Sequence, residues 1–320
     1  MAPTAYSGSV PGPKACPDNS LQILLLYAAV VLIWGSTWAA IPFQLGTVAE
    51  EVSVGYRFGL AAIALYAYAL ISRRPLRLPG GAVPFVFLQG ALLFCINYFF
   101  VYYGTAYLTT GVVAVLFSSI LILNAIFERL FFGRRIDTRF WLAATVGITG
   151  ITLIFSTEIV DFSLTDRSVH GGLLVLFGTL IASLGNMAAV FNTKQGLPVV
   201  AVNAHAMAFA AVLALLIAVA TGKQLEFSLR IDYVASLLYL AVFGSAVAFG
   251  CYLALLRIIG AARAAYSSVL FPVVALLIST AFEGYRWTTP AVIGMLLTLV
   301  GNWLILSQRK NKQQHKGIQQ

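Results

Sequence analysis

The stretch FGCYLALLRIIGAARAAYSSVLFPVVALLISTAFE, residues 249–283, decides the fold because its pattern occurs twice in the chain. It contains an apolar run, a short break between Arg257 and Arg263, and a second apolar run that ends in Phe-Glu. Residues 94–128 repeat this order, with a break near 105–110 and the same Phe-Glu ending. Few residues are identical, so the two copies are related by pattern. Repeats of this kind are common in secondary transporters.

The composition is that of a membrane protein. Of the 320 residues, 60% are hydrophobic and 10% are charged, whereas a soluble domain carries about 25% charged residues. The net charge is +9, but the basic residues lie between the apolar runs, where they determine membrane topology. The charge therefore gives no reason to expect a nucleic-acid partner. The three cysteines, at positions 16, 95 and 251, have the number and spacing of neither a disulfide framework nor a metal site.

Apolar runs of about 20 residues span a bilayer, and the sequence contains ten runs near that length, joined by short connections. We therefore predict an all-α polytopic membrane protein with ten transmembrane helices. The predicted spans are 21–44, 52–71, 83–104, 109–132, 138–155, 171–192, 199–220, 233–256, 263–282 and 290–306.

The predicted spans divide into two halves of five. Because five is odd, the second half must be inverted relative to the first, and inverted halves offer the two packings that alternating access requires. The predicted organisation is a disordered N-terminal tail (1–20), a first five-helix repeat (21–156), an outer connecting loop (157–170), a second five-helix repeat (171–307) and a basic cytoplasmic tail (308–320).

The distribution of bases predicts the orientation. Four bases fall in the connections on one side, at positions 167, 223, 230 and 286, and Arg57 lies within a span. The other fifteen Lys and Arg lie on the side of the two termini. Since bases accumulate in cytoplasmic loops, we expect both termini to be cytoplasmic in a protein of the cell (inner) membrane.

Several motifs resemble the ten-span branch of the drug/metabolite transporter superfamily, often called EamA-type. They are WGSTW at 34–38, Arg57, and GAARAA at 260–265 leading to Pro272 and Glu283. The stretch NYFFVYYG at 97–104 resembles the aromatic amino-acid exporters of this family. The family often has a proline in the fourth span, which LFSS at 116–119 lacks. The resemblance covers residues 21–307 and implies export of small metabolites from the cytoplasm.

Two tryptophans are predicted to line a cavity. Trp34 and Trp38 lie near the middle of the first span, four residues apart and therefore on one helical face. An indole N–H facing lipid at that depth would be unpaired, which is unfavourable. Both side chains are therefore expected to face the interior, either as walls of an aromatic cavity or as interior packing. Tyr102 and Tyr103, near the end of the third span, are instead expected in the interfacial aromatic belt.

Polar residues at depth are candidates for substrate contact. Asn97, Asn186, Ser245 and Tyr252 lie away from the predicted span ends. Each needs a partner or water. The alternative to a substrate contact is an interhelical hydrogen bond, worth roughly 0.6 to 2 kcal/mol.

Pro272 and three charged residues complete the candidate list. Pro272 lies at the middle of the ninth span and is expected to kink that helix, either as a hinge or as a static bend. Glu128 and Glu283 end their spans and are assigned as gate or structural charges. Arg57 is an intramembrane charge, which is a functional candidate by default, although its side chain could instead snorkel outward.

These features favour a secondary transporter that exports small organic metabolites, chiefly amino acids with aromatic or other bulky apolar side chains, by alternating access. The alternative is a multidrug or cation exporter driven by proton exchange, which normally needs a membrane-embedded carboxylate. No Asp or Glu lies in the middle of a predicted span. Motifs of intramembrane enzymes and nucleotide-binding loops are also missing from the sequence. The expected partners are a small-molecule substrate and the lipid bilayer, with no cofactor, and fused halves favour a monomer.

Overall fold

The computed structural model describes residues 20–46, 48–108, 113, 116–134, 136–154, 156, 166–282 and 287–316, and these residues form helices and connections without a strand. The first half contains α1 (Ser20–Ala40), η1 (Ile41–Gln44), α2 (Glu50–Ile71), η2 (Gly80–Ala82), α3 (Val83–Gln89), η3 (Gly90–Ile96), α4 (Asn97–Thr105), α6 (Ile120–Phe132) and α7 (Thr138–Ile154). The second half contains α9 (Asp166–Lys194), α10 (Val199–Ala220), α11 (Ile231–Ala241), η4 (Val242–Val247), α12 (Ala248–Ile259), α13 (Ala261–Ala265), η5 (Tyr266–Leu270), α14 (Phe271–Phe282) and α15 (Thr289–Lys316).

The described helices are those of a polytopic membrane protein. Six of them are long and apolar enough to cross a bilayer: Ser20–Thr37, Glu50–Ile71, Gly80–Thr105, Arg167–Lys194, Val199–Ala220 and Ile231–Ile259. Two shorter apolar helices, Thr138–Ile154 and Thr289–Leu304, accompany them. Large apolar side chains are also exposed along these helices, among them Leu24, Leu70 and Leu216. Exposed apolar side chains in this number are what a lipid-facing surface requires.

Several predicted boundaries differ from the structure. Helix α9 begins at Asp166, so the last part of the predicted outer loop is already helical. Helix α15 runs to Lys316, well into the segment predicted as a basic tail. The ninth predicted span is not one helix, because it is divided into α13, the 3-10 segment η5 and α14. Apolarity marks where a helix crosses lipid, but it does not mark where the helix ends in water.

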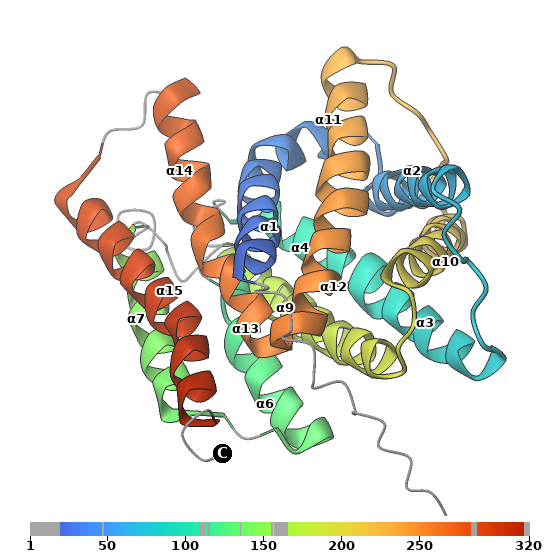
Figure 1. Ribbon diagram of the computed structural model, residues 1–320. Coiled ribbons are helices and arrows are strands. Elements are labelled where there is room, and N and C mark those ends of the chain that lie inside the picture. The colour runs from blue at the N-terminus through green and yellow to red at the C-terminus, as the bar shows by residue number, and fades with distance from the viewer. Residues whose placement is uncertain are drawn as a thin grey trace, which may run out of the picture.

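The packing joins elements from the two halves in matching pairs. Helix α2 packs on α10, and α7 packs on α15 (Figure 1). Helix α1 packs on α12 and α14, while α9 packs on α4 and α6. The α7–α15 contact is made close by glycines: a Cβ on Gly150 would lie 2.5 Å from Thr298 Oγ1, and one on Gly301 would lie 3.0 Å from the carbonyl oxygen of Ala143. Small residues that let backbones approach are typical of helix contacts in membranes.

The third helical stretch of each half contains a π-helical segment. In the first half η3 separates α3 from α4, and in the second half η4 separates α11 from α12. Such π-helical turns are rare and occur frequently at functional sites. Both segments pack against helices of the other half: η3 packs on α9 and α10, and η4 packs on α2.

Candidate functional site

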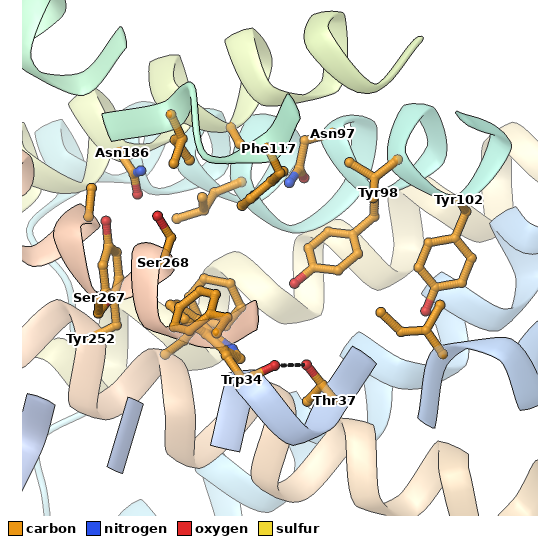
Figure 2. A pocket seen from close by; sticks show the side chains of 18 of the residues that line it. Trp34, Thr37, Asn97, Tyr98, Tyr102, Phe117, Asn186, Tyr252, Ser267 and Ser268 are labelled. Carbon is orange, nitrogen blue, oxygen red and sulfur yellow. Dashed lines mark hydrogen bonds between the residues drawn. The ribbon is translucent and has the colours of Figure 1, made fainter. Parts of the chain in front are cut away.

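A cavity of about 110 Å³ lies between the two halves, with residues from α1, α2, α4, α9, α12 and the α13–α14 region around it (Figure 2). Its lining is mostly aromatic and aliphatic, with a few polar groups, which is the usual composition of a small-molecule site. The lining residues are Trp34, Thr37, Ile41, Arg57, Leu93, Asn97, Tyr98, Val101, Tyr102, Phe117, Ile120, Ala182, Asn186, Phe249, Tyr252, Ala265, Ser267, Ser268 and Phe271.

Trp34 forms the centre of an aromatic cluster on one wall of this cavity. Its ring centroid lies 4.8 Å from that of Phe249, 5.1 Å from that of Tyr252 and 5.6 Å from that of Phe271. Its indole Nε1 donates to the carbonyl oxygen of Gly244 at 2.9 Å. The N–H that would be unpaired in lipid therefore has a partner inside the protein. Three ring contacts and this hydrogen bond together fix the position of the indole.

The π-helical segment η4 positions two of the cavity side chains. Gly244 accepts the hydrogen bond from Trp34, and the next residue, Ser245, accepts one from Arg57 Nε at 2.9 Å. A side chain at Gly244 would crowd this arrangement, because a Cβ there would lie 2.9 Å from Thr37 Cγ2 and 3.4 Å from Arg57 Nη2. The glycine thus leaves room for the guanidinium next to the indole.

Arg57 is the charged residue of the cavity wall. It is 2% exposed, and its Nη1 lies 3.4 Å from the hydroxyl of Tyr102. Its Cζ lies 4.9 Å from the ring centre of Tyr98 and 5.5 Å from that of Phe58. Cation–π contacts of this kind stabilise a guanidinium at short range but do not neutralise its charge. The alternative of a snorkelling side chain is therefore wrong, since the group points inward.

Amide groups lie at the opposite end of the cavity. Ser183 Oγ donates to Asn124 Oδ1 at 2.6 Å, and Asn186 Nδ2 approaches the same oxygen at 3.3 Å. The carbonyl oxygens of Asn186 and Asn97 are buried without a hydrogen-bond donor in the described part of the chain. Asn97 and Asn186 both line the cavity, and Figure 2 shows them on its upper side, across from Trp34. Unpartnered buried acceptors beside a cavity can receive a donor from a ligand or water.

The structure brings four of the six predicted contact residues together: Trp34, Asn97, Asn186 and Tyr252 all line the cavity. Ser245 is buried behind the wall, where it holds Arg57. The side chain of Trp38 lies outside the described part of the structure, as does the whole of Glu283.

The structure shows how Pro272 affects its helix and how Glu128 joins two helices. Pro272 is the second residue of α14, and α14 directly follows η5. Its missing N–H cannot bond to the carbonyl of Ser268, so the helix in front of it tightens into 3-10 form instead of continuing as the predicted kinked helix. Glu128 is buried; its Oε1 accepts from Arg134 Nη1 at 3.0 Å and from the Ala261 N–H at 2.9 Å. It therefore ties α6 to the start of α13.

Sequence reasoning missed Tyr98 and misplaced Tyr102. Tyr102 was predicted in the interfacial belt, but it is 1% exposed and contacts Arg57. The two tyrosines are four residues apart on α4, which is the spacing that places Trp34 and Trp38 on one face. The same periodicity could therefore have identified them as a second aromatic wall facing Arg57.

Comparison with known proteins agrees with this architecture. The sequence matches the EamA-like transporter family over residues 21–156 and 169–307. Protein PagO of Salmonella typhimurium is 27% identical over 305 residues, which cover 91% of this chain and 97% of PagO. The Escherichia coli K12 protein named uncharacterized inner membrane transporter YedA is 27% identical over 292 residues, covering 87% of this chain and 91% of YedA. The Bacillus subtilis protein named uncharacterized transporter YdfC is 23% identical over 286 residues, which cover 88% of this chain and 90% of YdfC.

The fold has also been seen in a crystal structure. That protein superposes with a TM-score of 0.73 at 17% identity, over 90% of this chain and 98% of the other. At this identity the likeness concerns the fold alone. The family match, in contrast, covers nearly all of the sequence between residues 21 and 307. The chain therefore belongs to the EamA-like transporter family, and it is an integral membrane transporter and not an enzyme.

Proposed function

We propose that this protein is a secondary transporter that exports small organic metabolites, chiefly amino acids with aromatic or other bulky apolar side chains. Transport proceeds by alternating access through the cavity around Trp34. The observation that carries the proposal is the cluster of Trp34 with Phe249, Tyr252 and Phe271 on the cavity wall. Aromatic walls favour a ligand with a large apolar or aromatic part.

The packing of the described helices supports ten spans in two inverted repeats. In chain order, α1 corresponds to α9, α4 to α12 and α6 to α14. The repeat therefore predicts that a contact of α1 with α12 is matched by one of α9 with α4, and a contact of α1 with α14 by one of α9 with α6. All four contacts occur. The pairs α2–α10 and α7–α15 are unchanged when the two halves are exchanged, as expected for elements beside a two-fold axis. The π-helical segments η3 and η4 also occupy matching helices. Repeats related in this way provide two near-equivalent packings, one open to each side.

The cavity disfavours the alternative of a proton-driven cation exporter. None of the described residues that line it is an Asp or Glu, and its one charged lining residue is Arg57. A cationic drug would meet a positive group in a site of low dielectric, where like charges repel strongly. We also infer, from the distribution of bases, that both termini are cytoplasmic, and, from the fusion of both halves in one chain, that a monomer is sufficient.

The test is flux of labelled solutes in proteoliposomes that contain the purified protein and no ion gradient. Phenylalanine, tryptophan, glycine and the lipophilic cation tetraphenylphosphonium are compared. We expect phenylalanine and tryptophan to move down their own gradients faster than in protein-free vesicles, and glycine and the cation to remain at the protein-free rate. The same fluxes are then measured with a proton gradient imposed across the vesicle membrane. Movement of the cation alone, seen only with that gradient, would overturn the proposal.

A further inference from the structure

We infer that Arg57 binds the carboxylate of the transported solute, which narrows the substrates to organic acids and amino acids with a bulky apolar part. This inference rests on the proposed function, because it assigns a role within the same cavity. It begins from the burial of a full positive charge. Arg57 is 2% exposed, and a buried charge is normally paired with an opposite one because desolvation is otherwise unfavourable.

Arg57 has no such protein partner in the part of the chain that the structure describes. The ion pairs found there join Arg134 to Glu128 and Arg230 to Asp232. Glu51, on the same helix as Arg57, accepts a hydrogen bond from the Tyr103 hydroxyl instead. The groups that contact Arg57 are the neutral Ser245 and Tyr102 and aromatic rings. Among the described residues, none therefore compensates the charge of this guanidinium at the cavity wall.

The guanidinium also has donors to spare. It carries five N–H groups, of which Nε bonds Ser245 and Nη1 reaches Tyr102. Nη2 has no hydrogen-bond acceptor among the described residues. Because Ser245 fixes Nε and the two flanking rings fix the plane, the remaining donors form a preorganised fork. Such a fork matches the two oxygens of a carboxylate.

The surroundings of the fork determine the rest of the ligand. A single positive charge matches a singly charged carboxylate, whereas a doubly charged phosphate would leave one negative charge uncompensated in a site of low dielectric. Trp34 and Tyr98 line the same cavity and offer aromatic faces to an apolar body (Figure 2). The unpartnered carbonyl oxygen of Asn97, next to Tyr98 in the chain, could accept a hydrogen bond from an ammonium group. An apolar amino acid satisfies all three features.

The inference is tested by selectivity between two probes that differ in the carboxylate alone. L-phenylalanine and L-phenylalaninamide share the ring and the amino group, but the second lacks the negative charge. Flux of both is measured in proteoliposomes with the wild-type protein, Arg57→Gln, Arg57→Lys and a control, Arg139→Gln. The control removes the same charge from an exposed residue.

We expect Arg57→Gln to raise the KM for phenylalanine by about tenfold to a hundredfold, the usual effect of losing a charge-assisted hydrogen bond, while the KM for phenylalaninamide falls or stays unchanged. Arg57→Lys should keep part of the preference, and Arg139→Gln should match the wild type. An equal loss of both probes in a protein that melts normally would show a structural role for Arg57 and overturn the inference. Unchanged phenylalanine transport in Arg57→Gln would do the same.

A wild-type competition assay avoids any folding defect in the variants. Inhibition of phenylalanine flux is compared for 3-phenylpropionate, which keeps the carboxylate, and phenethylamine, which keeps the amine. The carboxylate should compete more strongly. If phenethylamine competes better, Arg57 does not select the substrate, although aromatic transport stands. If no aromatic probe moves or competes in the wild type, it is the proposed function that fails.

Discussion

Replacing Trp34 tests whether the aromatic wall contacts the transported solute. Trp34→Phe keeps a ring but removes the 2.9 Å hydrogen bond from Nε1 to the Gly244 carbonyl, which lowers stability by about 1 kcal/mol. Trp34→Ala also removes three ring contacts, each worth about 0.5–1.5 kcal/mol. The thermal midpoint should therefore fall slightly in Trp34→Phe and further in Trp34→Ala.

Substrate affinity should follow a different order from stability. A ring lost from the substrate contact weakens binding by about 0.5–1.5 kcal/mol, or about two- to tenfold in KM. We therefore expect the KM for phenylalanine to rise by about that factor in Trp34→Ala and by less in Trp34→Phe. The assay is flux in proteoliposomes, with Trp303→Ala as a matched control because Trp303 is 67% exposed on the outer surface. A Trp34→Ala protein that folds and keeps the wild-type KM would refute the assignment of this wall.

Two further predictions concern stability and are measured as thermal midpoints in detergent. Gly150→Ala should destabilise the α7–α15 contact by about 1–3 kcal/mol, since its methyl group would lie 2.5 Å from a side-chain oxygen of α15; the matched Gly250→Ala, with no atom within 4 Å, should not lower the midpoint. Glu128→Gln should lower the free energy of unfolding by less than about 1 kcal/mol. The ion pair that it removes is with Arg134, which is half exposed, and the Gln oxygen can still accept from the Ala261 N–H. Glu128→Ala removes that acceptor and should lower the free energy of unfolding by about 1–3 kcal/mol more than Glu128→Gln does. Equal midpoints for the two Glu128 variants would contradict this assignment.

Hydropathy predicts the helices well because the hydrocarbon of a bilayer permits few backbone conformations. A backbone in hydrocarbon must satisfy its own hydrogen bonds, so each long apolar run becomes a helix. Six described helices meet that expectation by length and composition. The division of the ninth run into α13, η5 and α14 was not predicted. Hydropathy measures the side chains of a segment and is insensitive to the hydrogen-bond register of its backbone.

Depth and polarity predicted part of the cavity lining. A polar or indole group at depth needs a partner, which favours Trp34, Asn97, Asn186 and Tyr252 as lining residues, and all four line the cavity. The rule does not say whether that partner is solute or protein. Ser245 illustrates the limit, because it is equally deep in its helix but lies behind the wall and bonds Arg57.

The equivalence of the two halves that the proposed repeat implies does not extend to the chemistry of the cavity. At the contact of α1 with η4, Trp34 fills the space and bonds the Gly244 carbonyl. At the contact of α9 with η3, which the proposed repeat makes equivalent, a Cβ on Gly185 would lie 2.8 Å from the backbone nitrogen of Leu93. One contact therefore holds a bulky indole while the other brings two backbones together. A repeated pattern specifies the packing that both halves share, whereas recognition of a solute depends on the residues that differ between them. The sequence indicates Arg57 as an intramembrane charge, but its contacts with Tyr98 and Tyr102, which join α2 to α4, are seen only in the folded chain.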